Sequence, residues 1–218
     1  MVIDFTEIRD DHAFENFCMH LMEIMGLKIA VRPAKGPDGG RDIISEEPNR
    51  FTAMGYRYLV SCKHYAGSRR SVGNSHDEAN ANKLVEHGCN GFMFFFSTAY
   101  TENFKTSVEK VCNQKRCSYR IFNCYDIENI LLSSPYYYPL IKQYFPRSHN
   151  QLVELKNTEP CCPDIGDDEP LYALYTSDEY GNVSYEVLGQ CCISHCVDDL
   201  ERQRVPYGVS QLRSAQTW

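Results

Sequence analysis

The first part of the chain carries apolar residues at helical spacing and then in shorter alternating runs. Residues 10–25 place apolar side chains along one helical face, with acidic residues near the start and Gly26 at the end, which predicts a helix. Residues 27–32 alternate apolar and basic positions, as a half-buried strand does. Residues 33–40 are rich in turn-forming residues, and residues 41–45 resume an extended run.

The middle of the chain alternates predicted strands and helices. Residues 91–96 form a continuous apolar run, Gly-Phe-Met-Phe-Phe-Phe, which is typical of a strand covered on both faces. The pattern further predicts a loop leading into a strand over 51–63, a polar loop over 64–74, helices over 75–87, 101–112 and 126–132, and a strand over 119–122. Because strands that alternate with helices favour parallel pairing, we expect an α/β domain with a mixed sheet.

The last third of the chain differs in composition. The tyrosine-rich residues 135–146 close a main domain that spans 1–146, and the polar, proline-containing and acidic residues 147–169 predict a linker. Residues 171–175 and 183–188 predict a β-hairpin. We therefore expect residues 170–218 to form a small, mainly-β C-terminal unit with a regulatory or assembly role, although the pattern from residue 191 onward is ambiguous.

Charge is distributed unevenly along the chain. Residues 1–150 carry 18 Lys and Arg against 17 Asp and Glu, whereas residues 151–218 carry 4 against 12. A nearly neutral main domain can still present a local basic face to phosphates. The sequence has no apolar run of about 18 residues and no signal-peptide pattern at its start, so we expect a cytoplasmic protein without a membrane partner.

The eleven cysteines are an odd number in a chain too long for a disulfide-stapled miniprotein, so reduced and mostly buried thiols are favoured. An alternative is a structural zinc site in the C-terminal third. Its candidate ligands are Cys161, Cys162, Cys192, His195 and Cys196, with Cys191 close by. No Cys-x-x-Cys pair supports that alternative.

An acid and a lysine stand at the ends of two neighbouring predicted strands. Asp42 follows a glycine turn, Gly-Pro-Asp-Gly-Gly-Arg at 36–41, and Lys63 ends the run Leu-Val-Ser-Cys-Lys at 59–63. Phosphodiester hydrolysis needs a divalent metal and a cation that neutralises developing charge. Asp42, Glu15 on the first helix and the backbone carbonyl of Cys62 could hold Mg²⁺ or Mn²⁺, with Lys63 as the cation. Taken singly, Asp42 is also compatible with a surface position and Glu15 with an ordinary helix carboxylate.

These residues resemble the PD-(D/E)xK nuclease superfamily and, more narrowly, its Mrr-like restriction endonuclease branch. The resemblance covers roughly residues 10–135 and rests on Phe14-Glu15, the glycine turn at 36–42, Val-Ser-Cys-Lys-His-Tyr at 60–65, and the strand and helix from residue 91. It implies that Glu15, Asp42 and Lys63 occupy the active-site positions of the family and that Asp38 is the first Asp of the glycine turn.

The resemblance also implies a fold and an activity. The fold is a restriction-endonuclease-like mixed central sheet flanked by helices, and the activity is Mg²⁺-dependent endonucleolytic hydrolysis of DNA, in restriction or anti-phage defence. A homodimer or larger assembly, or a partner protein of a defence system, is implied as well. Lys35, Arg41, Arg69 and Arg70 are candidate DNA-phosphate contacts because they flank the active strands, and a solvated loop is the alternative for them.

One position departs from the family pattern. Ser61 stands where the family has Gln or Glu, so a direct side-chain metal ligand is shortened or lost. A serine hydroxyl can still reach a metal-bound water, and Ser61 therefore stays among the candidate catalytic residues. The alternative function is a catalytically weakened nuclease fold that binds nucleic acid or a partner.

Overall fold

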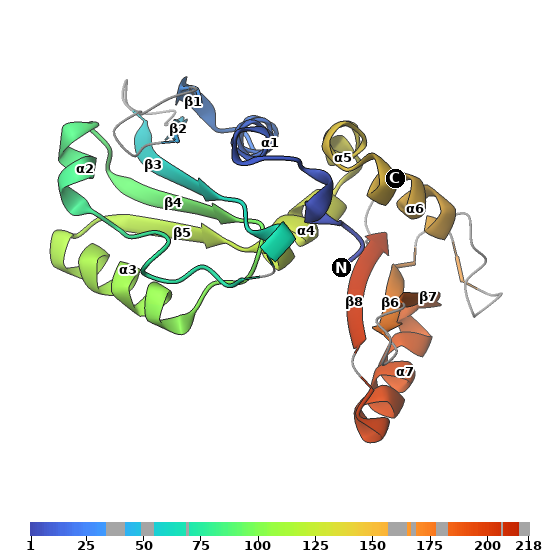
Figure 1. Ribbon diagram of the computed structural model, residues 1–218. Coiled ribbons are helices and arrows are strands. Elements are labelled where there is room, and N and C mark those ends of the chain that lie inside the picture. The colour runs from blue at the N-terminus through green and yellow to red at the C-terminus, as the bar shows by residue number, and fades with distance from the viewer. Residues whose placement is uncertain are drawn as a thin grey trace. The chain divides into compact units, whose positions relative to one another are not determined.

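The structure is a computed structural model that describes residues 1–33, 42–48, 55–68, 70–156, 165–166, 169–177, 183–205 and 207–213. Contacts divide the chain into two compact units (Figure 1). The N-terminal unit comprises Phe5–Ile127, and the C-terminal unit comprises Met1–Asp4 with Glu128–Trp218. Each unit has a sheet of its own.

The N-terminal unit is built on a five-stranded sheet with the order β1-β2-β3-β4-β5. The strands are β1 (Lys28–Val31), β2 (Ile43–Glu47), β3 (Tyr56–Lys63), β4 (Gly91–Phe96) and β5 (Ser118–Phe122). β1, β2 and β3 pair antiparallel, whereas β3, β4 and β5 pair parallel. The mixed sheet is therefore confirmed, and every residue of the apolar strand β4 is buried.

Helices cover both faces of this sheet (Figure 1). Helix α1 (Asp11–Ile24) packs on one face against β1, β2 and β3, and it begins where the Asp10 side chain accepts a hydrogen bond from the N–H of Ala13. Helices α2 (Ala81–Glu86) and α3 (Glu102–Lys115) cover the opposite face. There Phe94 and Phe96 of β4 pack edge-on against Phe104 of α3. The unit also contains the short 3₁₀ helices Phe5–Glu7 and Ala66–Ser68.

The helix predicted over 75–87 is wrong in its first half. Helix α2 begins only at Ala81, because the side chain of Asn80 accepts a hydrogen bond from the N–H of Asn82 and caps the helix there. Before it, the N–H groups of His76 and Asp77 both donate to the carbonyl of Gly73 and form a turn. Residues 75–80 therefore belong to the connection between β3 and α2.

The C-terminal unit contains a three-stranded antiparallel sheet with the order β7-β6-β8. Its strands are β6 (Leu171–Ser177), β7 (Val183–Gly189) and β8 (Tyr207–Arg213), and the β6–β7 hairpin agrees with the prediction. Helix α7 (Gln190–Gln203) packs on this sheet, with Ile193 against Leu174 and Leu188. The ambiguous residues after 191 thus form most of a helix and one strand.

Four helical segments precede that sheet: α4 (Cys124–Leu132), the 3₁₀ helix Pro135–Tyr137, α5 (Tyr138–Tyr144) and α6 (Pro146–Lys156). Helix α6 occupies the first half of the segment predicted as a linker, and it forms because Leu152 and Leu155 bury one side of an otherwise polar stretch. In the part of the chain that the structure describes, no helix combines the length and the apolar character that crossing a membrane requires.

Candidate active site

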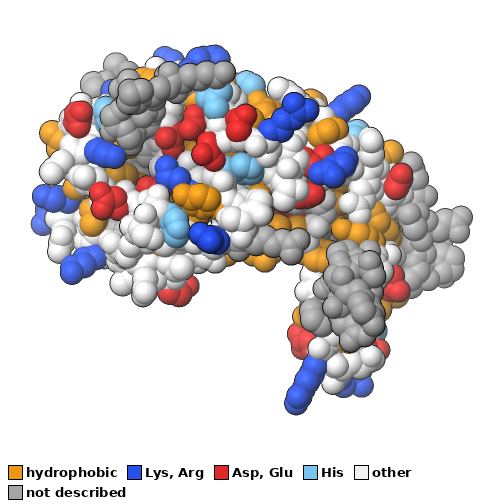
Figure 2. All heavy atoms as spheres, viewed as in Figure 1, with side chains coloured by type: hydrophobic (Ala, Val, Ile, Leu, Met, Phe, Trp, Pro, Cys, Tyr) orange, Lys and Arg blue, Asp and Glu red, His pale blue; other side chains and the backbone are white. Residues whose placement is uncertain are grey.

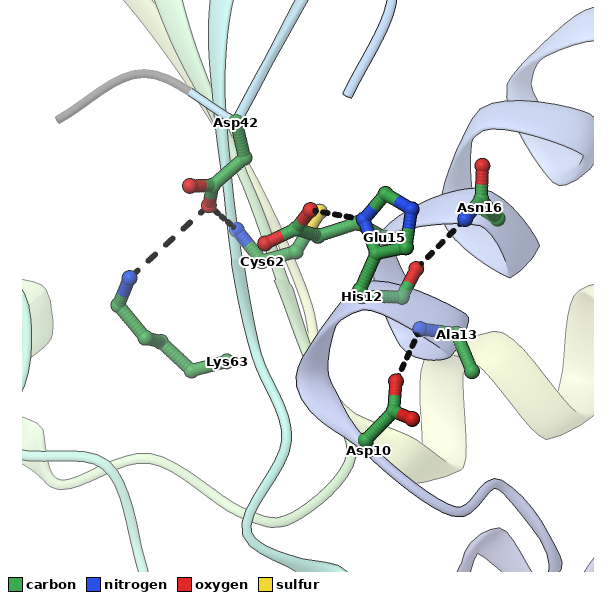
Figure 3. A network of polar contacts seen from close by, with 8 residues as sticks. All are labelled: Asp10, His12, Ala13, Glu15, Asn16, Asp42, Cys62 and Lys63. Atoms are coloured by element: carbon green, nitrogen blue, oxygen red, sulfur yellow. Dashed lines mark hydrogen bonds and ion pairs between the residues drawn. The ribbon is translucent and has the colours of Figure 1, made fainter. Parts of the chain in front are cut away.

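The structure brings Asp42 and Lys63 together at the end of the antiparallel part of the sheet. Asp42 immediately precedes β2, and Lys63 is the last residue of β3. Because Ile43 pairs with Val60, Asp42 lies beside Ser61. The Lys63 Nζ atom is 3.9 Å from Asp42 Oδ2, and the side chains are 28% and 14% exposed. The two residues that the sequence placed at strand ends therefore form an ion pair (Figure 3).

Two neighbours orient the Asp42 carboxylate. The N–H of Cys62 donates to Asp42 Oδ2 at 2.5 Å, and the Ser61 hydroxyl donates to the same oxygen at 3.2 Å. Cys62 lies beyond the last β2–β3 pair, Ile43 with Val60. Because the N–H and C=O of a strand residue point to the same side, the Cys62 carbonyl faces Asp42 as well. A carboxylate and a backbone carbonyl thus converge at this point.

Lys63 stays protonated at neutral pH. Burial acts to lower the pKa of Lys63, but attraction by Asp42 and then Asp77 outweighs it, so the pKa of the ammonium group is raised above its ordinary value. The side chain is therefore a positive charge rather than a general base. A fixed ammonium group can stabilise negative charge that develops on a phosphate.

Glu15 approaches Asp42 from the side of α1 rather than from the side of Lys63. Side chains alternate along β3, so Cys62 faces α1, whereas Ser61 and Lys63 face the other side of the sheet. The Glu15 carboxylate lies 3.4 Å from the Nδ1 atom of His12, and Figure 3 shows it beside Cys62. Glu15 and Asp42 thus lie on either side of Cys62 (Figure 3).

Cys62 itself is not a candidate nucleophile. Burial is the first cause that raises the pKa of the Cys62 thiol, followed by its neighbour Cys18 and by the negative charges of Asp42 and Glu15. The thiol is therefore neutral at physiological pH, and a neutral thiol is a poor nucleophile. Cys62 acts in the site through its backbone.

The sequence reasoning missed Asp77. A cavity of about 430 Å³ is lined by residues of β3, of the connection 74–78 and of α2, namely Asp42, Ser61, Lys63, Asn74, Ser75, His76, Asp77, Glu78 and Lys83. Asp77 Oδ1 accepts a hydrogen bond from the N–H of Glu78, whereas its buried Oδ2 has no hydrogen-bond partner. The only sequence signal was an acidic pair, Asp77-Glu78, inside a stretch that resembled a helix.

Other predicted site residues are distributed differently. Lys35, Asp38, Arg41 and Arg69 lie outside the described residues, and Arg70 is exposed after β3. His64, next to Lys63, contacts the carbonyl of Ile8 through Nε2 at 2.9 Å and stacks on Phe14, so it has a packing role.

The cysteines of the C-terminal third give no assembled zinc site within the described part of the chain. Cys192, His195 and Cys196 lie on α7, and Cys161 and Cys162 lie outside the described residues. Across the ranges that the structure describes, no three His, Cys, Asp or Glu side chains lie close enough to hold a metal ion. Cys191, Cys192 and Cys196 form no disulfide; Cys191 is exposed, and Cys192 and Cys196 are half-buried.

The donor atoms around Asp42 fit Mg²⁺ or Mn²⁺. Mg²⁺ is usually bound by one or two carboxylates together with waters and substrate phosphates, so a complete protein cage is not required. The Asp42 carboxylate, the Cys62 carbonyl and the orphaned Oδ2 of Asp77 are hard oxygen donors. Figure 2 shows Asp and Glu side chains gathered on one face of the N-terminal unit, and a cation would offset their repulsion of a nucleic acid.

The fold and this site define a class: a restriction-endonuclease-like α/β domain with an acid and a lysine at the ends of adjacent strands. Residues 9–115 match the Mrr catalytic-domain family model, which is described as "Restriction endonuclease". This segment is therefore a restriction endonuclease domain of the Mrr type, and the resemblance drawn from the motifs is confirmed. It is a nuclease domain by family.

No curated protein is significantly similar in sequence to the chain. Among solved structures, the chain is similar to "MspJI Restriction Endonuclease in Complex with 27-mer Oligonucleotide", with 14% sequence identity and a TM-score of 0.41. The match covers 69% of this chain and 33% of that one, so the chain spans about a third of the length of that protein.

Proposed function

We propose that the chain is a metal-dependent endonuclease that hydrolyses phosphodiester bonds of DNA, with Mg²⁺ or Mn²⁺ as its cofactor. The observation that carries this proposal is the pairing of the Asp42 carboxylate with the Lys63 ammonium group at 3.9 Å, inside the segment that matches the family. An acid that can hold a metal and a fixed cation beside it are the two requirements of phosphodiester hydrolysis.

Each residue has a distinct role in the proposed reaction. Asp42, with the Cys62 carbonyl and with Glu15 from the side of α1, would hold the metal, which when bound polarises the scissile phosphate and lowers the pKa of the attacking water. The Cys62 N–H and the Ser61 hydroxyl hold the Asp42 carboxylate in one orientation. Lys63, whose charge is retained, orients the attacking water and stabilises the negative charge that develops on the phosphate.

DNA would approach over basic side chains next to the site. Arg70 is exposed in the connection that follows β3, and Lys35, Arg41 and Arg69 are close in sequence to β2 or β3. Arginine binds phosphate oxygens in a bidentate manner and sets the position of the duplex without reading its sequence. We propose these four residues as phosphate contacts.

A second candidate function is a nucleic-acid or partner binding module with weakened catalysis. Ser61 is the observation that favours it, because its hydroxyl donates to Asp42 where the family has a side chain that can bind the metal directly. Binding to DNA without metal-dependent cleavage would support this candidate. We further propose that the protein works in restriction or anti-phage defence, as a homodimer or with a partner protein. Two strands need two cuts, and the family resemblance implies a dimer or larger assembly.

A substrate panel tests the proposed function. Purified protein is incubated with circular, linear and single-stranded DNA and with RNA, with and without Mg²⁺. Wild-type protein should cut DNA only when metal is present, and Lys63→Ala should cut at least about 100-fold more slowly. Equal cleavage by wild type and Lys63→Ala would exclude the proposed site, and cleavage of RNA alone would reassign the substrate.

A further inference from the structure

Strand β3 carries no carboxylate on the face where Lys63 lies, because Ser61 stands where the family has Gln or Glu. Ser61 and Lys63 alternate with Cys62 along β3 and therefore face the same side of the sheet, where Ser61 offers only a hydroxyl. Glu15 comes from the α1 side and is not part of the lining of the cavity beside Lys63. A metal held by Asp42 would thus have no carboxylate from β3 itself.

Asp77 brings a carboxylate to this same cavity from a different element. It lies in the connection between β3 and α2, and it lines the cavity together with Asp42, Ser61 and Lys63. The Lys63 ammonium group, the Ser61 hydroxyl and the Asp42 carboxylate all lie near enough to act on the Asp77 carboxylate. The turn at Gly73, which ends before α2, sets this position.

The buried Oδ2 atom of Asp77 argues against a purely structural role. Oδ1 accepts a hydrogen bond from the N–H of Glu78, but Oδ2 is enclosed without a hydrogen-bond partner. An enclosed carboxylate oxygen without a hydrogen-bond donor is costly, because it has lost the hydrogen bonds that water would make. The Lys63 ammonium group and the Ser61 hydroxyl, which line the same cavity, offset part of this cost. A bound cation would satisfy the orphaned oxygen.

We propose that Asp77 is a metal ligand that supplies, from the connection before α2, the carboxylate that Ser61 does not provide. The proposal rests on the proposed nuclease function, because it concerns the metal of that site. The ligand would be a hard divalent cation such as Mg²⁺ or Mn²⁺, to which Asp42 and Asp77 would each offer carboxylate oxygens. Ser61 then serves as a positioning residue, whose hydroxyl donates to Asp42 at 3.2 Å.

Metal binding, measured without any substrate, tests this proposal. Mn²⁺ is titrated into wild-type protein, Asp77→Asn and Glu78→Gln, and binding is followed by calorimetry and by the electron paramagnetic resonance signal of unbound Mn²⁺. Glu78 is the matched control, because it is the adjacent acidic residue, lines the same cavity and is exposed. Asp77→Asn should weaken Mn²⁺ binding at least about tenfold, and Glu78→Gln should bind Mn²⁺ as wild type does.

An exchange variant separates a ligand from a structural residue. Ser61→Asp combined with Asp77→Ser keeps the composition and the net charge and returns the carboxylate to β3. It should bind Mn²⁺ more tightly than Asp77→Asn, by at least about fivefold. Unchanged Mn²⁺ affinity in Asp77→Asn, or equal affinity in the exchange variant and Asp77→Asn, would overturn the proposal.

The outcome for DNA cleavage is read separately. If wild-type protein binds Mn²⁺ through Asp77 but cuts no DNA, the proposed function fails and the metal ligand stands. If wild-type protein cuts DNA and Asp77→Asn binds Mn²⁺ normally, the function stands and the ligand assignment fails.

Discussion

Replacing Lys63 by methionine removes the positive charge of the site while retaining a side chain of similar length. The Lys63–Asp42 ion pair spans 3.9 Å between partly exposed side chains, and such a pair contributes on the order of 1 kcal/mol to folding. For a chain of this size, a loss of 1 kcal/mol lowers Tm by roughly 2–4 °C. We therefore expect Lys63→Met to fold, with a small decrease in thermal stability.

The expected loss of activity is much larger than the loss of stability. A fixed charge that stabilises the transition state is worth about 2.7–4 kcal/mol, which corresponds to a 10²–10³-fold lower rate. The assay is single-turnover cleavage of plasmid DNA at saturating Mg²⁺, with melting curves for each variant. Lys83→Met is the control, because Lys83 lies on α2 and lines the same cavity, and it should lose less than about tenfold. A Lys63→Met rate within threefold of wild type (about 0.7 kcal/mol) would refute the assigned role.

Three further predictions concern stability and are measured by thermal or denaturant unfolding. Burial raises the pKa of Asp77, so above the ordinary Asp pKa the ionised carboxylate destabilises the folded chain relative to the unfolded chain. Asp77→Asn should therefore raise Tm at pH 7 in EDTA. This gain in Tm should shrink as the pH falls toward the ordinary pKa of Asp. A lower Tm for Asp77→Asn would show that the carboxylate stabilises the fold. Glu128→Ala should destabilise the C-terminal unit by about 2–4 kcal/mol, because it leaves the N–H of Ile3 and the hydroxyl of Ser210 without their acceptor; a loss below 1 kcal/mol would contradict this. Phe94→Ala should cost about 3–5 kcal/mol, since Phe94 is only 1% exposed between β4 and α3, and an unchanged midpoint of unfolding would disprove that packing.

The parts of the fold that depend on local pattern could be predicted from the sequence. The apolar run of β4 is typical of a strand covered on both faces, and the spacing of Phe14, Phe17 and Leu21 is typical of a helix with one buried face. Asp42 and Lys63 were recognisable because Asp42 stands at the start of one short strand and Lys63 at the end of the next. These features need nothing beyond neighbouring residues.

The parts that depend on contacts between distant residues could not be predicted. Residues 75–80 resembled the start of a helix, yet Asn80 caps α2 later and a turn at Gly73 redirects the chain. The spacing of apolar residues does not show that Asp77 and Lys63 line the same cavity. Helix α7 was likewise not predicted, because the pattern from residue 191 onward is ambiguous.

The central claim is that Asp42 holds the metal with which the chain cuts DNA. The most direct test is conversion of supercoiled plasmid to open-circular or linear DNA by wild type and Asp42→Ala, each with Mg²⁺, with Mn²⁺ and with EDTA. We expect wild type to cut only with metal and Asp42→Ala to be inactive while remaining folded. Cleavage by Asp42→Ala at the wild-type rate, or cleavage by wild type in EDTA, would contradict the claim.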